Sequence, residues 1–230
     1  MRTLVVGCDA SGKSSLVEGI SGRYGDIAFE ATSTDESRRF KHDNLDTLID
    51  DELVNEREDL YMRLSRTVLG RLAMSSTADS YIGTDSTLVT RLSHNVMRRC
   101  IGGKAIEYDK LVEQWVKDEA EFGLAPPNIV AITYAPFDLI RSRIQARYDN
   151  GDKDEKFWGF NSPFFLEKYQ NAWLEVREYL PQAGISCISF DTSLATIEDS
   201  LSVYATVRDG HSNPAPPISL VSPLSQIPRQ

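Results

Sequence analysis

The stretch VVGCDASGKSS, residues Val5–Ser15, is the feature that most constrains what this chain can fold into. From Gly7 to Ser14 it fits the pattern G-x-x-x-x-G-K-[ST] in full. The β-branched run Arg2–Val6 precedes it, and a helical pattern follows it as far as Gly25. This order of strand, glycine loop and helix is the context in which the pattern forms a phosphate loop. We therefore predict that a nucleoside triphosphate binds here.

The chemistry of such a loop assigns a role to each part of it. Glycine lets the backbone curl so that successive N–H groups point at phosphate oxygens, and the helix that follows adds its positive amino-terminal end. Lys13 is expected to reach the β- and γ-phosphates, and Ser14 to ligate Mg²⁺. The predicted nucleotide-binding residues of the loop are Gly7, Ala10, Ser11, Gly12, Lys13, Ser14 and Ser15.

Short apolar runs alternate with helical patterns along the rest of the chain. The run NIVAITY, Asn128–Tyr134, is continuous and follows two prolines, which is typical of a strand buried on both faces. Further strands are predicted at 2–6, 26–32, 79–85 and 185–193, and helices at 46–73, 86–100, 105–122, 137–148, 163–180 and 195–207. This alternation predicts an α/β fold with a five-stranded parallel sheet flanked by helices.

The domain organisation follows from where these patterns stop. We expect a single domain over residues 1–209, with a helical region at about 40–122 and an exposed excursion at about 149–162. Residues 210–230 hold five of the ten prolines of the chain and show no periodicity. They are predicted to form a flexible, proline-rich tail.

The composition narrows the kinds of binding partner and the cellular location that can be expected. The formal net charge is −9, from 34 acidic and 25 basic residues, which weakly disfavours a protein that must hold long nucleic acid. Cys8, Cys100 and Cys187 lie far apart and form no C-x-x-C pair, so neither a disulfide framework nor a zinc site is indicated. A reducing cytoplasm is the expected location. No apolar run is long enough for a signal peptide or a membrane span, and no membrane partner is expected.

A phosphate loop alone does not separate GTPases, ATPases and kinases, but other motifs do. The N-K-x-D motif that reads guanine in GTPases is absent, and so is the run of four apolar residues ending in Asp-Glu that large ATPases carry. The remaining class is a small kinase that moves the γ-phosphoryl group to a small acceptor.

At this point the sequence resembles the thymidylate kinase-like branch of nucleoside and nucleoside-monophosphate kinases, and the resemblance covers about Arg2 to Val207. The family pattern G-x-[DE]-x-x-G-K-[ST] is matched by Asp9, and the resemblance implies that this carboxylate meets the sugar of the acceptor. The alternative is that Asp9 only caps the following helix.

Two further segments are similar to family segments that bind the acceptor. LYMRLSRTVL places Arg66, with Tyr61 nearby, where the family grips the acceptor phosphate; the alternative for Arg66 is a solvated helix position. GTDST places Asp85 where the family has an acidic residue that helps to hold Mg²⁺ or orients the attacking oxygen. The arginine that follows this acidic residue in the family is replaced by Ser86, and Arg91 is a candidate to supply the missing charge.

The segment ITYAPFDLIRSRIQAR is similar to a family strand followed by a helix that carries R-I-x-x-R. Arg143 and Arg147 are four residues apart, hence on one helical face, and the resemblance implies that they close over the transferring phosphoryl group. Arg141 is off that face and is expected to be solvated. The excursion 149–162 corresponds to the family's lid, and SFDTSLATIEDSL places Asp191 and Thr192 beside the adenine.

The sequence therefore predicts a P-loop kinase that uses Mg²⁺ and ATP to phosphorylate a deoxynucleoside monophosphate, with Lys13, Asp85, Arg143 and Arg147 as catalytic residues. One alternative in the same fold phosphorylates a nucleoside or a 5-hydroxymethyl pyrimidine in DNA, which would make DNA a partner. A second alternative is a nucleotide-binding regulator without transferase activity. Family members often pair, so a homodimer is a mild expectation.

Overall fold

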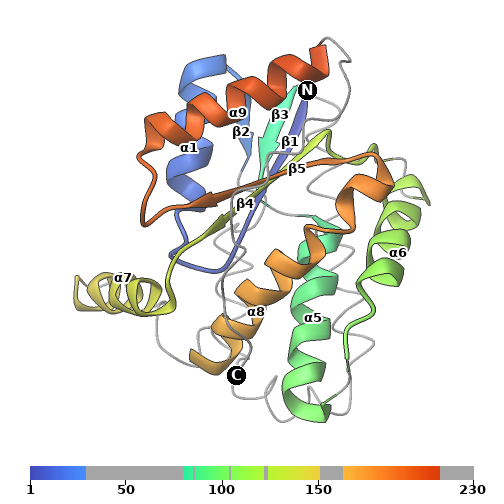
Figure 1. The fold of residues 1–230 in the computed structure, drawn as a ribbon, viewed down its shortest axis with the longest axis vertical. Coiled ribbons are helices and arrows are strands. Elements are labelled where there is room, and N and C mark those ends of the chain that lie inside the picture. The colour runs from blue at the N-terminus through green and yellow to red at the C-terminus, as the bar shows by residue number, and fades with distance from the viewer. Residues whose placement is uncertain (30–79, 85, 104, 122–123, 151–162, 213–230) are drawn as a thin grey trace, which may run out of the picture.

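The structure is a computed structural model, and it describes residues 1–29, 80–84, 86–103, 105–121, 124–150 and 163–212. The elements in chain order are β1 (Arg2–Val6), α1 (Lys13–Tyr24), β2 (Ile27–Phe29), β3 (Tyr81–Gly83), α5 (Thr87–Gly102), α6 (Tyr108–Glu121), β4 (Ile129–Tyr134), α7 (Phe137–Asp149), α8 (Pro163–Val176), the 3₁₀ turn η3 (Leu180–Ala183), β5 (Ser186–Asp191) and α9 (Ile197–Ser212) (Figure 1).

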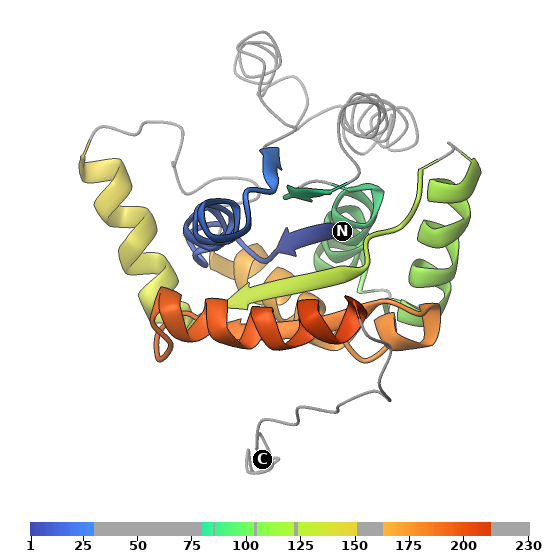
Figure 2. The same ribbon diagram turned by 90° about the horizontal axis from the view of Figure 1, so that it is seen from above.

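All five strands are parallel and lie in the order β2-β3-β1-β4-β5, so the predicted five-stranded α/β sheet is confirmed. The chain first adds β2 and β3 on one side of β1, then crosses to add β4 and β5 on the other. In such sheets ligands bind beyond the carboxyl ends of the strands where the order reverses, which here is at β1 and β4. Figure 2 shows the arrows of β1 and β4 pointing toward the end of the molecule where α7 lies.

Alternate residues of the central strands pack into two separate cores. Leu4, Val6, Val130 and Ile132 face a core shared with α5, α6 and α8, whereas Val5, Ile129 and Ala131 face a core shared with α1 and α9. This two-sided burial is why the sequence of β4 is a continuous apolar run. The helices consequently form one layer on each face of the sheet (Figures 1 and 2).

Helix ends differ from the predictions by a few residues, and the caps explain why. Gly25 and Gly103 adopt left-handed conformations that end α1 and α5, as the glycine positions predicted. Pro136 is the N-cap of α7 and not part of its first turn. α9 continues to Ser212, past the helix end predicted at residue 207, so its last three residues fall in the range expected for the tail; the domain boundary at residue 209 stays a prediction.

Several predicted features lie outside the described residues. They are Tyr61, Arg66 and Asp85, the helix at 46–73, most of the excursion at 149–162 and the tail after residue 212. Within the described part of the chain, no helix combines the length and the apolar character that crossing a bilayer requires.

Candidate nucleotide-binding site

The loop between β1 and α1 has backbone conformations that favour glycine at two positions. Gly7 has φ 145° and Gly12, the N-cap of α1, has φ 97°, both in the region that favours glycine. An added Cβ at Gly7 would overlap the carbonyl oxygen of Thr133 on β4. Ala10 also has a positive φ, of 59°. The two glycines of the motif are therefore required for the curled loop that the sequence predicts.

Ser11 holds this loop against the sheet from inside. Its Oγ lies 2.7 Å from the Oγ1 of Thr133, which in turn donates to the carbonyl of Val6 at 3.2 Å. Both hydroxyls are fully buried. The side chain of Ser11 therefore holds the loop in place, and Ser11 can contact a ligand only through its backbone.

Lys13 lies folded across the loop that it follows. Its Nζ donates to the carbonyl of Gly7 at 3.1 Å and of Cys8 at 2.8 Å, and lies 3.4 Å from Asp9 Oδ1. Phosphate oxygens are stronger acceptors for an ammonium group than peptide carbonyls are. The lysine is therefore positioned at the loop, where a phosphate would compete with these carbonyls.

Asp9 does not cap the helix, which removes the alternative weighed against its functional role. The N-cap is Gly12, and no side chain caps α1. The Asp9 side chain is 53% exposed and contacts Lys13. Ser14 and Ser15 occupy the first turn of α1 and are exposed, so their hydroxyls lie at the positive end of that helix. The predicted roles of Asp9 at the acceptor and of Ser14 at Mg²⁺ stay predictions.

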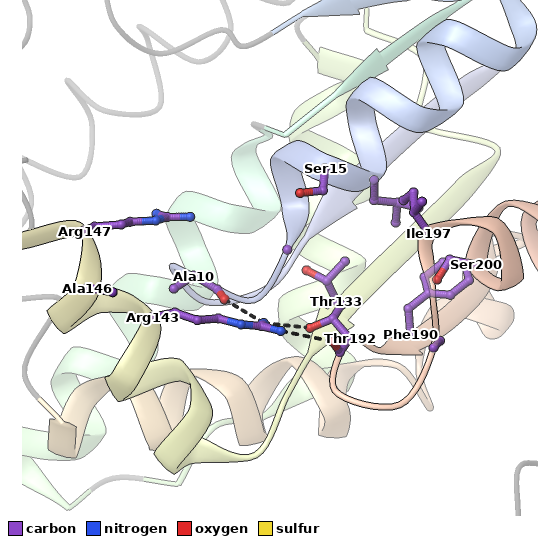
Figure 3. Close-up of a pocket in the computed structure, with 13 residues that line it drawn as sticks. Ala10, Ser15, Thr133, Arg143, Ala146, Arg147, Phe190, Thr192, Ile197 and Ser200 are labelled. Atoms are coloured by element: carbon purple, nitrogen blue, oxygen red, sulfur yellow. Dashed lines mark hydrogen bonds between the residues drawn. The ribbon is translucent and has the colours of Figure 1, made fainter. Parts of the chain in front are cut away.

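A cavity of about 460 Å³ lies between the loop, α7 and the turn that follows β5 (Figure 3). One side is apolar, formed by Leu16, Phe190, Ala195 and Ile197. The other carries the charge of Arg143 and Arg147 from α7. An apolar lining with a few convergent polar groups is the usual form of a small-molecule or cofactor site. The full lining is Ala10, Gly12, Ser15, Leu16, Thr133, Arg143, Ala146, Arg147, Phe190, Thr192, Ala195, Ile197 and Ser200.

The two arginines of α7 differ in exposure and in the side of the phosphate loop on which they lie. Arg143 donates from Nη1 to Ala10 O at 3.1 Å and to Thr192 Oγ1 at 3.0 Å, and from Nη2 to Thr192 O at 3.0 Å. Arg147 is one helical turn further on and exposed, and it lies on the opposite side of Ala10 from Arg143 in the view of Figure 3. Arg141 is exposed, as predicted. The predicted roles of Arg143 and Arg147 at the transferring phosphoryl group stay predictions.

The turn after β5 is built around the two residues predicted to lie beside adenine. Asp191 Oδ1 accepts from the N–H of Ser193 at 2.9 Å and from its hydroxyl at 2.6 Å, which closes the turn. Thr192 lines the cavity and lies so close to Gly12 that a Cβ there would stand 3.1 Å from its Cγ2. This close approach brings the phosphate loop and the turn together at one edge of the cavity.

The polar side chains of α5 and α6 pair with other groups of the protein. Arg91 forms an ion pair with Asp118, whose other oxygen accepts from Gln114 at 2.9 Å. Ser86 caps α5 by accepting from the N–H of Val89 at 3.3 Å. The position where the family pattern has an arginine thus serves as a helix cap here. The acceptor role proposed for Arg91 stays a prediction, and its charge already has a carboxylate partner.

Sequence reasoning missed a polar residue that bridges two segments near the loop. Gln170 of α8 donates to Ala135 O at 2.9 Å and accepts from Ala135 N–H at 3.2 Å. It also accepts from the Cys8 thiol at 3.6 Å, and burial raises the pKa of that thiol to about 11. Gln170 belongs to the apolar face that includes Leu166, Tyr169 and Trp173, and a lone amide on such a face is the signal that was available.

Comparison with known proteins agrees with this geometry at the level of fold. No protein-family model matches the sequence, and no curated protein matches it. Among solved structures, the deoxyadenosine kinase from M. mycoides with bound dCTP matches with a TM-score of 0.60 at 15% identity, over 91% of this chain and 100% of that one. The thymidylate kinase from Candida albicans matches with a TM-score of 0.56 at 15% identity, over 92% of each chain. The YorR protein from Bacillus subtilis, in complex with phosphorylated GDP, matches with a TM-score of 0.52 at 13% identity, over 92% of this chain and 98% of that one.

The chain has the fold of these kinases. The fold expected from the resemblance to thymidylate kinase-like proteins is thereby confirmed over nearly the whole length of the chain. The identities of 13–15% carry no information about the acceptor.

Proposed function

We propose that this chain is a kinase that transfers the γ-phosphoryl group of ATP to a deoxynucleoside monophosphate. The observation that carries the proposal is the folded phosphate loop opening onto a cavity of about 460 Å³ whose polar wall holds Arg143 and Arg147. A pure nucleotide binder does not need further cations beyond the phosphate loop, whereas transfer between two charged groups needs at least one, and Arg147 is exposed at the cavity. The kinase fold shared with the deoxyadenosine and thymidylate kinases supports the same conclusion.

The residues present fit a triphosphate with its Mg²⁺. The loop backbone is curled, with positive φ at Gly7, Ala10 and Gly12, and the exposed residue Ser14 stands in the first turn of α1. Ser14 would hold the Mg²⁺ ion together with Asp85, which lies outside the described residues. The ion supplies charge neutralisation at the β- and γ-phosphate oxygens when it is bound.

The remaining groups act through position and charge. Lys13 exchanges its carbonyl partners for phosphate oxygens, and Arg147 is exposed at the cavity where the leaving and attacking oxygens carry charge. The base of the donor lies against the apolar wall formed by Phe190, Ala195 and Ile197. Excluding water from this arrangement directs the phosphoryl group to the acceptor.

One observation favours a second candidate, a kinase for a nucleoside or for a 5-hydroxymethyl pyrimidine in DNA. Ser86 caps α5 at the position where the family pattern has an arginine, and Arg91 is paired with Asp118. An acceptor without a 5′-monophosphate does not need those cations. The acidic net charge of −9 counts against long DNA as the substrate.

The test is phosphoryl transfer from Mg·ATP across a panel, followed by mass spectrometry. The panel contains the deoxynucleosides, their 5′-monophosphates, free 5-hydroxymethyl pyrimidine nucleotides and a DNA duplex that carries these bases. A new diphosphate from one monophosphate is the expected result and identifies the acceptor. A phosphorylated base in DNA, or a phosphorylated nucleoside, with monophosphates unchanged would replace the first candidate with the second. ATP binding without any phosphorylated product would contradict both.

A further inference from the structure

Arg143 joins three segments that are distant in the sequence. It projects from α7 and donates to the phosphate loop at Ala10 O and to the turn after β5 at Thr192 Oγ1 and Thr192 O, at 3.0–3.1 Å. Figure 3 shows the guanidinium group lying between these two loops. A planar guanidinium group suits this task because its donors point in fixed, diverging directions.

Thr192 extends the same connection back to the phosphate loop. Its Oγ1 donates to Ser11 O at 2.9 Å and also lies 3.3 Å from Tyr134 O, while it accepts from Arg143. Its methyl group is the nearest neighbour of a Cβ built on Gly12, at 3.1 Å. Two consecutive carbonyls of the phosphate loop, those of Ala10 and Ser11, are thereby tied to Arg143 and Thr192.

Fixing these carbonyls also fixes the peptide that links the two residues. A peptide group is planar and trans, so its C=O and N–H point in opposite directions. With Ala10 O held by Arg143, the N–H of Ser11 points into the loop, where it donates to Cys8 O at 3.3 Å. This hydrogen bond closes the turn from Cys8 to Ser11, so holding Ala10 O also holds the curl of the phosphate loop.

We infer that Arg143 is a positioning residue, which sets the phosphate loop and the β5–α9 turn relative to each other and so shapes the nucleotide cavity. It acts on the ligand through Ala10 and Thr192. Arg147, which is exposed on the same helical face, is then the arginine that meets the transferring group. The consequences for turnover rest on the proposed function, whereas the consequences for loop order do not.

The first test follows amide hydrogen exchange in the full-length protein without nucleotide. In Arg143→Gln we expect faster exchange in residues 7–12 and 191–196, because both loops lose a charged donor. Arg141→Gln, which changes an exposed arginine of the same helix, is the matched control and should leave exchange in both loops unchanged. Thr192→Val, which removes Oγ1 at nearly constant volume, should accelerate exchange in the phosphate loop in the same way. Unchanged exchange in both loops in Arg143→Gln would overturn the inference.

The second test measures ATP affinity by calorimetry and, where transfer occurs, kcat and KM. Arg143→Gln should weaken ATP binding about 10- to 100-fold, the usual effect of losing hydrogen bonds to a charged group, and raise KM accordingly. Arg143→Lys should recover less than half of this loss in logarithmic terms, because an ammonium group cannot span both loops. Arg147→Gln should lower kcat more than it weakens ATP binding.

The outcomes separate this inference from the proposed function. If Arg143→Gln lowers kcat with ATP affinity and exchange unchanged, Arg143 contacts the phosphoryl group itself and the positioning role is wrong. If the unsubstituted protein transfers no phosphate, the kinase proposal fails, while accelerated exchange in both loops of Arg143→Gln would still support the positioning role.

Discussion

The proposed donor side, which is the phosphate loop with the cavity beside it, and the helix pair α5–α6 use similar charged residues differently. At the donor side, Lys13 and Arg147 present charge at the phosphate loop and the cavity. Between α5 and α6, Arg91 is paired with Asp118, and the fully buried Glu119 accepts from Thr87 at 2.8 Å and Trp115 at 3.0 Å. A place near a strand end in the sequence therefore does not by itself identify a ligand-binding charge, because Arg91 follows β3 closely and pairs with a neighbouring helix.

The two regions also differ in what holds their geometry. The phosphate loop depends on backbone conformations at Gly7, Ala10 and Gly12 that few residues adopt. The α5–α6 pair depends on side chains that satisfy one another in a buried setting, where an unpaired polar group is costly. Substitutions should therefore impair binding on the donor side and stability between the helices.

The largest expected effect is the loss of transfer in Lys13→Ala. Removing the ammonium group withdraws a positive charge from the β- and γ-phosphates, and a single donor of this kind contributes roughly 100- to 1000-fold in rate. The fold should be retained, because Lys13 contacts only its own loop in the described structure. Turnover is measured with the acceptor that the panel identifies, and urea unfolding checks stability. Lys117→Ala is the matched control, since that exposed lysine pairs with Glu113 on α6, and unchanged turnover in Lys13→Ala would contradict the kinase proposal.

The sequence was most informative where chemistry depends on the backbone. The loop at 7–14 could be predicted because glycine positions and the strand–loop–helix order encode it locally. The parallel sheet and the two-sided burial of β4 followed from the alternation of elements and the continuous apolar run, whereas the order of the strands was not predicted. These features need no knowledge of which distant residues meet.

Pairings across the chain could not be predicted in the same way. Arg143 meets Thr192 across 49 positions and Gln170 meets Ala135 across 35, and nothing local distinguishes Arg143 from Arg147. Ser86 was noted as a departure from the family pattern and Arg91 as a candidate to supply the missing charge, but neither the helix cap at Ser86 nor the ion pair of Arg91 with Asp118 was predicted. The long-range contacts depend on how distant segments pack against each other, which a single sequence does not specify.

The next largest effect is expected for Glu119, as loss of stability without loss of donor binding. Glu119→Ala leaves Thr87 and Trp115 without the acceptor that they share in a buried site, and should lower the free energy of unfolding by about 3 kcal/mol. Glu119→Gln keeps a carbonyl oxygen for both donors and should cost less. Urea unfolding measures the stability, and calorimetry with ATP measures binding. A large loss of ATP affinity in folded Glu119→Ala would show that the two regions are coupled.

A smaller loss of stability is expected for Arg91→Ala. It distinguishes a structural role in the ion pair with Asp118 from a role in binding the acceptor. Arg91→Ala removes the partner of Asp118, which is 8% exposed, and should lower the free energy of unfolding by about 2 kcal/mol. Asp118→Asn should cost less, and the double variant should lose less than the sum of the two. If Arg91 binds the acceptor instead, Arg91→Ala will raise the acceptor KM while stability stays nearly constant.

The smallest effect concerns the ion pair between Asp26 and Arg208 at the far end of α9, whose contribution to stability is lost in acid. Asp26, just before β2, pairs with Arg208, accepts from Ser80 at 2.7 Å, and Arg208 also lies 4.2 Å above the Tyr24 ring. Burial by itself would raise the pKa of Asp26, but the hydrogen bonds from Arg208 and Ser80 hold it below its usual 3.8. Because the folded pKa is lower than the unfolded one, the stabilisation is fully present above about pH 4 and is lost as the pH falls through the folded value.

Asp26→Asn should therefore lower the thermal midpoint by a few degrees at pH 7 and by less at pH 3, so that the difference from the unsubstituted protein narrows in acid. Asp109→Asn is a suitable control, because that carboxylate is exposed in the first turn of α6. A difference that stays constant from pH 7 to pH 3 would mean that the carboxylate charge contributes nothing at this position. Since Asp26 precedes β2 at the amino-terminal end of the sheet, ATP affinity should be unaffected, which sets this pair apart from the charges at the carboxyl ends of the strands.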